Sequence, residues 1–223
     1  MSVRRADAVP RNPYFGLAAL LLVLASGALW FIDHNALHYS AYDAGTYGDF
    51  WPRRFGLIPH VLGGMTAALA GLVQLWLGLT GRVGRWHRRL GRIYVAGVAV
   101  GSVGAFYLAL TIDPKYFAYA AGLFGLACAW AVTTSMALFA VQQRALEQHR
   151  EWMIRSYVVT FAFVTFRLVE KILLPLNIAP AQEIDSLLAF GCWSVPLLLA
   201  EPLIQLRRIA RRRYDRVLNI TEV

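Results

Sequence analysis

Residues 86–94 read Trp-His-Arg-Arg-Leu-Gly-Arg-Ile-Tyr, and residues 149–157 read His-Arg-Glu-Trp-Met-Ile-Arg-Ser-Tyr. Each stretch has a His-Arg pair followed by an arginine and a tyrosine, with one additional residue in the second copy, and each opens a long apolar run. A basic segment that enters hydrophobic sequence twice in the same way predicts two similar helix-loop-helix units. Residues 81–94 are expected to join one pair of helices, and residues 143–157 the next.

Composition indicates whether these units fold in water or in a membrane. The 223 residues are 58% hydrophobic and 16% charged, and the mean hydropathy is +0.49. Soluble domains carry about a quarter charged residues, so we expect an all-α, polytopic membrane protein that forms a single domain over residues 1–223. The net charge is +9, but the arginines stand in short segments between apolar runs. That pattern is typical of membrane topology and contact with lipids, and it disfavours nucleic acid as a partner.

Six apolar stretches are long enough to cross a bilayer, which takes about 20 residues. A signal peptide is the alternative for the first, but its uncharged run continues through Ile32, which favours a transmembrane helix. A polar, tyrosine-rich loop is expected over residues 34–55. The predicted spans are residues 14–33, 55–80, 93–112, 116–142, 153–176 and 186–206, and a basic tail follows over residues 207–223.

The distribution of basic residues predicts the orientation of these spans. Sixteen arginines lie in the N-terminal segment, the segments 81–92 and 143–152, and the tail, whereas the other side has only Arg53, Arg54 and Lys115. Short loops rich in Arg and Lys remain in the cytoplasm. Both termini are therefore expected to be cytoplasmic, in a multi-pass protein of the bacterial inner membrane.

Small residues recur at four-residue spacing in the second and third spans. Such spacing lets two helix backbones approach closely, so we predict helix contacts at these positions. They are Gly64, Ala68 and Gly71 in the second span, and Gly97, Gly101 and Gly104 in the third.

Charged and imidazole side chains inside a bilayer are costly, and each is a candidate for function. A rise of 1.5 Å per residue places Arg167, Glu170 and Lys171 at the depth of His60, toward the outer surface. Arg167 and Glu170 are three residues apart, and an ion pair between them is the simpler explanation of both charges.

A second layer of polar residues is expected near the cytoplasmic boundary. It contains His87, His149, Arg155 and Glu201. Arg155 and Glu201 are candidates for an ion pair between the fifth and sixth spans. The His-Arg pairs at the span ends are equally suited to reach lipid phosphates.

Histidines at equal depth on neighbouring transmembrane helices are also the axial ligands that haem b requires. His87 and His149 begin equivalent helices, so they are the first candidates for one iron. His60 is a candidate ligand of a second site, although no other span histidine is available to pair with it. The candidate partners of the haem propionates are Arg88, Arg150 and Arg155.

A metal-dependent membrane enzyme is a further alternative. His34 and His38 have the i, i+4 spacing that suits a metal ion on a helix, but no third ligand is evident beside them. The histidine clusters of membrane di-iron oxygenases and desaturases are absent from the sequence.

The stretch over residues 55–175 resembles a bacterial family of multi-span membrane proteins of unknown function. The resemblance rests on His-Arg-x-x-Gly-Arg-x-Tyr from His87, on His-Arg-x-Trp-Met-x-Arg-Ser-Tyr from His149, and on Arg167-Leu168. His60, Gly63, Gly71 and Gln74 add to it. It implies an integral membrane protein and supplies no activity.

The four central spans are also loosely similar to the helical cores of b-type cytochromes, an analogy of fold that does not establish function. On the basis of the histidines, we expect a protein that binds haem b or transfers electrons, with a redox partner or a second copy of the chain as its protein partner. The alternative is a non-enzymatic transporter or lipid-binding protein whose cytoplasmic layer holds anionic headgroups.

Overall fold

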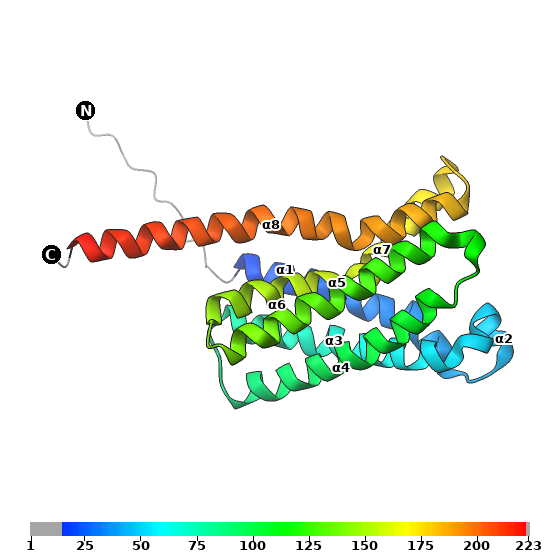
Figure 1. Cartoon of the computed structure of the whole chain (residues 1–223), viewed down its shortest axis with the longest axis horizontal. Helices are drawn as coiled ribbons and strands as arrows, with labels where there is room; N and C mark the ends of the chain where they lie inside the picture. Colours follow the sequence, from blue (N-terminus) through cyan, green and yellow to red (C-terminus); the bar gives the residue numbers. More distant parts are fainter. Residues whose placement is uncertain (1–14, 222–223) are drawn as a thin grey trace.

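The computed structural model describes residues 15–221, and their side chains as far as residue 211, as a bundle of helices (Figure 1). The long helices run back and forth along one axis, and short helical turns connect them at the ends. The elements are α1 (Phe15–Phe31), η1 (Ile32–Ala36), η2 (Leu37–Ser40), α2 (Ala44–Tyr47), η3 (Gly48–Arg53), α3 (Arg54–Leu79), α4 (Arg85–Leu110), η4 (Pro114–Tyr116), α5 (Phe117–Gln142), α6 (Leu146–Thr160), α7 (Ala162–Leu173), η5 (Leu174–Leu176) and α8 (Ala181–Thr221).

Five helical segments in the described part of the chain are long and apolar enough to cross a membrane. Large apolar side chains cover their outer surface, among them Leu22, Val103 and Leu198, each about 70% exposed. Such a surface suits lipid as its solvent, and the prediction of a polytopic helical bundle is confirmed. The segments are Phe15–Ser40, Ala44–Leu79, Arg85–Leu110, Pro114–Gln142 and Ala181–Arg211.

The fifth predicted span, residues 153–176, differs from a single helix. It is built from α6, which begins at Leu146, and α7, and the two meet at Phe161. The N–H of Phe161 donates to the carbonyls of both Tyr157 and Val158, at 3.1 and 3.2 Å, so the turn tightens there without a wide break.

Helices at one end of the bundle are longer than the hydrophobic runs predict. α4 and α6 begin in the basic segments, so the connecting turns shrink to residues 80–84 and 143–145. Gly81 and Arg144 adopt positive φ of 71° and 59° in these turns. We call this the basic end and the other, formed by residues 32–53 and 111–116, the opposite end. α1 begins and α8 finishes at the basic end (Figure 1).

The predicted basic tail is also helical, because α8 continues to Thr221. Pro196 and Pro202 lie inside α8 without ending it. Prolines are tolerated in membrane helices where neighbouring groups satisfy the freed carbonyls.

α3 and α4 form an antiparallel pair with close backbone contact, as the glycine spacing predicts. Gly97 and Gly104 face α3, and Gly101 lies between α3 and Trp130 of α5, so the predicted contacts of the third span are present. On α3, however, the contact is made by Gly63 and Ala67, because a Cβ at Gly63 would overlap the backbone of α4. The predicted pair Gly64 and Ala68 is therefore wrong by one residue, which is a rotation of about 100° around the helix.

Candidate functional site

The two copies of the repeated motif meet in the core of the bundle. The Tyr94 hydroxyl on α4 lies 2.6 Å from Ser156 Oγ and 2.8 Å from Thr160 Oγ1, both on α6. Tyr94 and Ser156 are completely buried. The tyrosine of the first motif thus bonds to the serine of the second.

α5 completes this hydroxyl network. Trp130 Nε1 donates to Thr160 Oγ1 at 2.8 Å, and Thr134 Oγ1 lies 2.7 Å from Ser156 Oγ. Buried polar groups that satisfy one another specify a unique packing. The network therefore fixes the register of α4, α5 and α6, a role that the sequence motif did not reveal.

The register places the two motif histidines at similar depths on α4 and α6. His87 precedes Tyr94 by seven residues, and His149 precedes Ser156 by the same interval. Seven residues are about two helical turns. His87 therefore lies on the same face of α4 as Tyr94, and His149 on the same face of α6 as Ser156, each about 10 Å nearer the basic end. The two imidazoles are close enough for their charges to interact.

Each histidine of this pair has a ring nitrogen that no hydrogen bond to the described residues occupies. His149 Nδ1–H donates to the Ala137 carbonyl at 2.8 Å, so Nε2 carries the free lone pair. His87 Nδ1 is buried without a partner among the described residues, and the Gln74 amide donates to the His87 carbonyl. The Ala137 carbonyl thus supports His149 in the usual way for a metal-ligating imidazole, whose second ring nitrogen donates to a carbonyl or carboxylate.

The arginines expected near this pair occupy three different environments. Arg88 is exposed on the first turn of α4. Arg150 is half-buried, and its Nε is buried with no partner in the described chain.

Arg155 is engaged by Glu201 on α8. Its Nε and Nη2 lie 3.0 and 2.9 Å from the two carboxylate oxygens, and Gln205 donates to the same carboxylate. The structure thus brings Arg155 and Glu201 together, and this bidentate contact leaves Arg155 a poor candidate for binding propionates.

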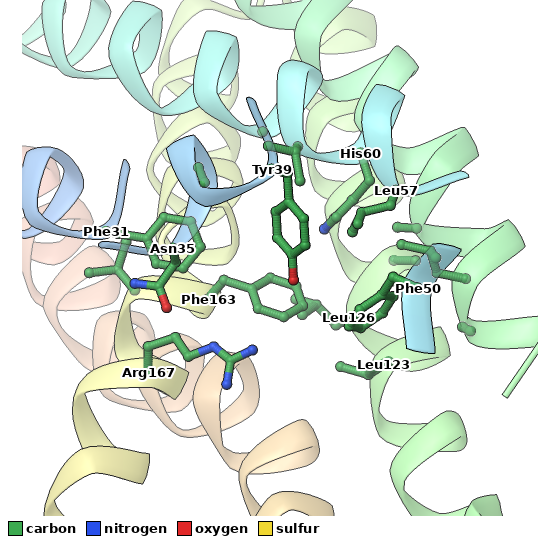
Figure 2. A pocket seen from close by; sticks show the side chains of 18 of the residues that line it. Phe31, Asn35, Tyr39, Phe50, Leu57, His60, Leu123, Leu126, Phe163 and Arg167 are labelled. Atoms are coloured by element: carbon green, nitrogen blue, oxygen red, sulfur yellow. The ribbon is translucent and has the colours of Figure 1, made fainter. Parts of the chain in front are cut away.

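The polar residues predicted for the outer layer gather at the opposite end of the bundle. Two of them line a cavity of about 900 Å³, which we call the distal pocket. His60 and Arg167 line it and point into it (Figure 2). Arg167 also pairs with Glu170 at 2.8 Å, whereas Lys171 turns away and lies over the ring of Trp30.

Two further polar residues of the distal pocket were not expected from sequence. Tyr39 and Asn35 enter it from the η1–η2 segment (Figure 2), which the sequence suggests is a loop. The Tyr47 hydroxyl holds this segment by donating to the Tyr39 carbonyl at 3.0 Å. Asp43 caps the following helix α2, where it accepts hydrogen bonds from the Thr46 hydroxyl and N–H. These bonds lower the pKa of the Asp43 carboxyl below its ordinary value. Tyrosines in a nominal loop beside a span were the only sequence signal.

The other histidines do not extend either site into a metal cluster. His34 Nδ1 bonds to the Trp30 carbonyl and His38 Nε2 to the Thr46 carbonyl, each at 3.1 Å. Across the part of the chain that the structure describes, no three His, Cys, Asp or Glu side chains converge on a position for a metal ion. His60 lies in the distal pocket, far along the bundle from His87 and His149.

Comparisons with known proteins agree with this architecture. Neither the curated proteins nor the solved structures include a match to this chain. The model of one family, described as predicted membrane protein (DUF2306), matches residues 57–204, which covers α4 to α7 and nearly all of α3. The chain therefore belongs to the DUF2306 family of predicted membrane proteins.

Proposed function

We propose that this protein binds haem b at the basic end and transfers electrons in the bacterial inner membrane. His87 and His149 would be the axial ligands. One observation carries the proposal: both histidines lie about two turns before the Tyr94–Ser156 hydrogen bond, on helices that run in the same direction, and so lie at about the same depth. Bis-histidine ligation takes two neutral imidazoles and no further protein ligand to the iron.

The donor set fits this cofactor. His149 presents Nε2 because its Nδ1–H is donated to Ala137, and His87 has a buried nitrogen that no described residue satisfies. Arg150, whose Nε has no partner among the described residues, is the first candidate to bind a propionate, and Arg88 is the second. Bound haem would supply a one-electron carrier, while the protein would hold its ligands and neutralise its carboxylates.

The test is an absorbance spectrum of the detergent-purified protein, oxidised and then reduced with dithionite. Protein from haem-replete cells should show Soret and α bands that sharpen on reduction. His87→Ala and His149→Ala should each abolish or shift these bands, and His60→Ala should leave them unchanged. Colourless wild-type protein from such cells would refute the proposal.

A second candidate function is the binding of anionic lipid headgroups at the basic end. This candidate is favoured by Arg207 and Arg211, which lie near enough to Arg150 for their positive charges to repel the charge of Arg150. Like charges that converge at a membrane surface attract phosphates. In this case phosphatidylglycerol should raise the thermal stability of the protein in nanodiscs, 0.5 M salt should weaken the effect, and Arg150→Gln should remove most of it.

A further inference from the structure

The distal pocket has the size and lining of a ligand site. Its volume of about 900 Å³ lies within the 300–1,000 Å³ typical of small-molecule pockets. Aromatic and aliphatic side chains form most of its wall, as Figure 2 shows for Phe31, Phe50, Leu57, Leu123 and Phe163. The walls come from both the first and the last helices of the bundle, so helices far apart in the sequence form the space together.

The polar groups in this wall include both an acceptor and donors. His60 Nδ1–H donates to the Gly101 carbonyl at 3.0 Å, so its Nε2 has a lone pair and accepts. Asn35 Nδ2 is buried with no partner among the described residues, and it can only donate. The Tyr39 hydroxyl also points into the space (Figure 2). A matching ligand offers one hydroxyl hydrogen and at least one oxygen acceptor.

The formal charges of the lining balance. Arg53 and Arg167 line the pocket together with Asp113 and Asp185. Beside it, Glu170 pairs with Arg167 at 2.8 Å and Lys115 pairs with Asp113 at 3.3 Å, so the sum of the charges stays zero. A fatty acid or an anionic phospholipid would add an uncompensated charge to this apolar space. The balance favours an uncharged amphiphile.

We propose that the distal pocket binds the dihydroxy form of a membrane quinone, with one ring hydroxyl donating to His60 Nε2 and a ring oxygen accepting from Asn35. The flat ring and apolar tail of a quinol match the aromatic and aliphatic walls. The proposal concerns binding only, and it is independent of haem at the basic end.

The first experiment compares the two redox forms of one probe. The full-length protein in phosphatidylcholine nanodiscs is titrated with decylubiquinol under anaerobic conditions, and with decylubiquinone, by the quenching of tryptophan fluorescence. We expect saturable one-to-one binding of the quinol. The quinone should bind about tenfold more weakly, since it has no hydroxyl to donate to His60.

Three variants separate the site from the rest of the bundle. His60→Phe should reduce the affinity for the quinol to that for the quinone. Gly64→Phe should abolish binding, because Gly64 lines the pocket and a Cβ there meets nothing within 4 Å of the described structure. Gly191→Phe is the matched control, since its Cβ position is equally open and it is not part of the pocket lining. Each variant is first checked for a monodisperse elution profile.

Three results would overturn the proposal. Equal affinities of the wild-type protein for quinol and quinone would remove the role of His60 as acceptor. Undiminished binding to a well-folded Gly64→Phe variant would place the ligand elsewhere. Tighter binding of oleate than of decylubiquinol would show that the pocket selects an anionic amphiphile.

Discussion

Tyr94 is the residue on which the hydroxyl network depends, because its one oxygen contacts both Ser156 and Thr160. Tyr94→Phe keeps the ring and leaves two buried hydroxyls short of a partner, which costs about 1–3 kcal/mol. We expect a lower midpoint of thermal unfolding in detergent. Tyr107→Phe is the control, since Tyr107 is 43% exposed. Equal midpoints for both variants would show that the network contributes little to stability.

Arg155 and Glu201 permit a test by exchange. In Arg155→Met, the Gln205 amide is the remaining partner of the Glu201 carboxylate among the described residues. The loss of the charged hydrogen bonds should cost about 2 kcal/mol. The cost stays moderate because Glu201 is 42% exposed and its carboxylate remains partly solvated. The double variant Arg155→Glu with Glu201→Arg should recover part of this loss. Folded yield and unfolding midpoint are the measurements, with Arg208→Met as the exposed control. If the double variant loses as much stability as Arg155→Glu and Glu201→Arg lose in sum, the two residues do not interact.

At the scale of elements, the contact between α3 and α4 depends on which glycine of an adjacent pair faces inward. A methyl group at Gly63 would overlap the backbone of α4, whereas the Cβ position of Gly64 is open. Gly63→Ala should therefore separate the helices and destabilise the protein by about 1–3 kcal/mol. Gly64→Ala should be neutral or stabilising by up to about 1 kcal/mol, through helix propensity alone.

Unfolding midpoints of these two alanine variants, measured side by side, decide the rotation of α3. If Gly64→Ala were less stable than Gly63→Ala, Gly64 would be the glycine that faces α4, as the four-residue spacing predicted. Because both variants add the same methyl group one position apart, differences in expression or hydrophobicity do not affect the comparison.

At the scale of the whole molecule, the prediction is the orientation in the membrane. The basic end carries the short turns with most of the arginines, and such loops remain cytoplasmic. Reporter fusions at Gly84 and at the C-terminus should therefore read cytoplasmic, and fusions after Lys115 and near Pro180 periplasmic. A periplasmic reading at the C-terminus would contradict a bundle in which α6 and α7 together cross the membrane.

Much of this molecule follows from its sequence alone. Long apolar runs must become helices in lipid, because no water is present to satisfy the backbone, and their lengths predict the multi-span bundle. The spacing of Arg167 and Glu170 places them on one face of α7, where they pair. The repeated motif predicts equal depths for His87 and His149, because depth along a helix follows from counting residues.

Only the tertiary structure decided which face of each helix points inward. In a soluble bundle the apolar stripe identifies the buried face, but α3 and α5 are apolar all around, since lipid and core are both hydrophobic. The sequence could not choose between Gly63 and Gly64, nor show that Tyr94 bonds to Ser156. The sequence could not predict the distal pocket either. Its wall combines side chains from several helices, and packing sets the rotation and the neighbours of each helix.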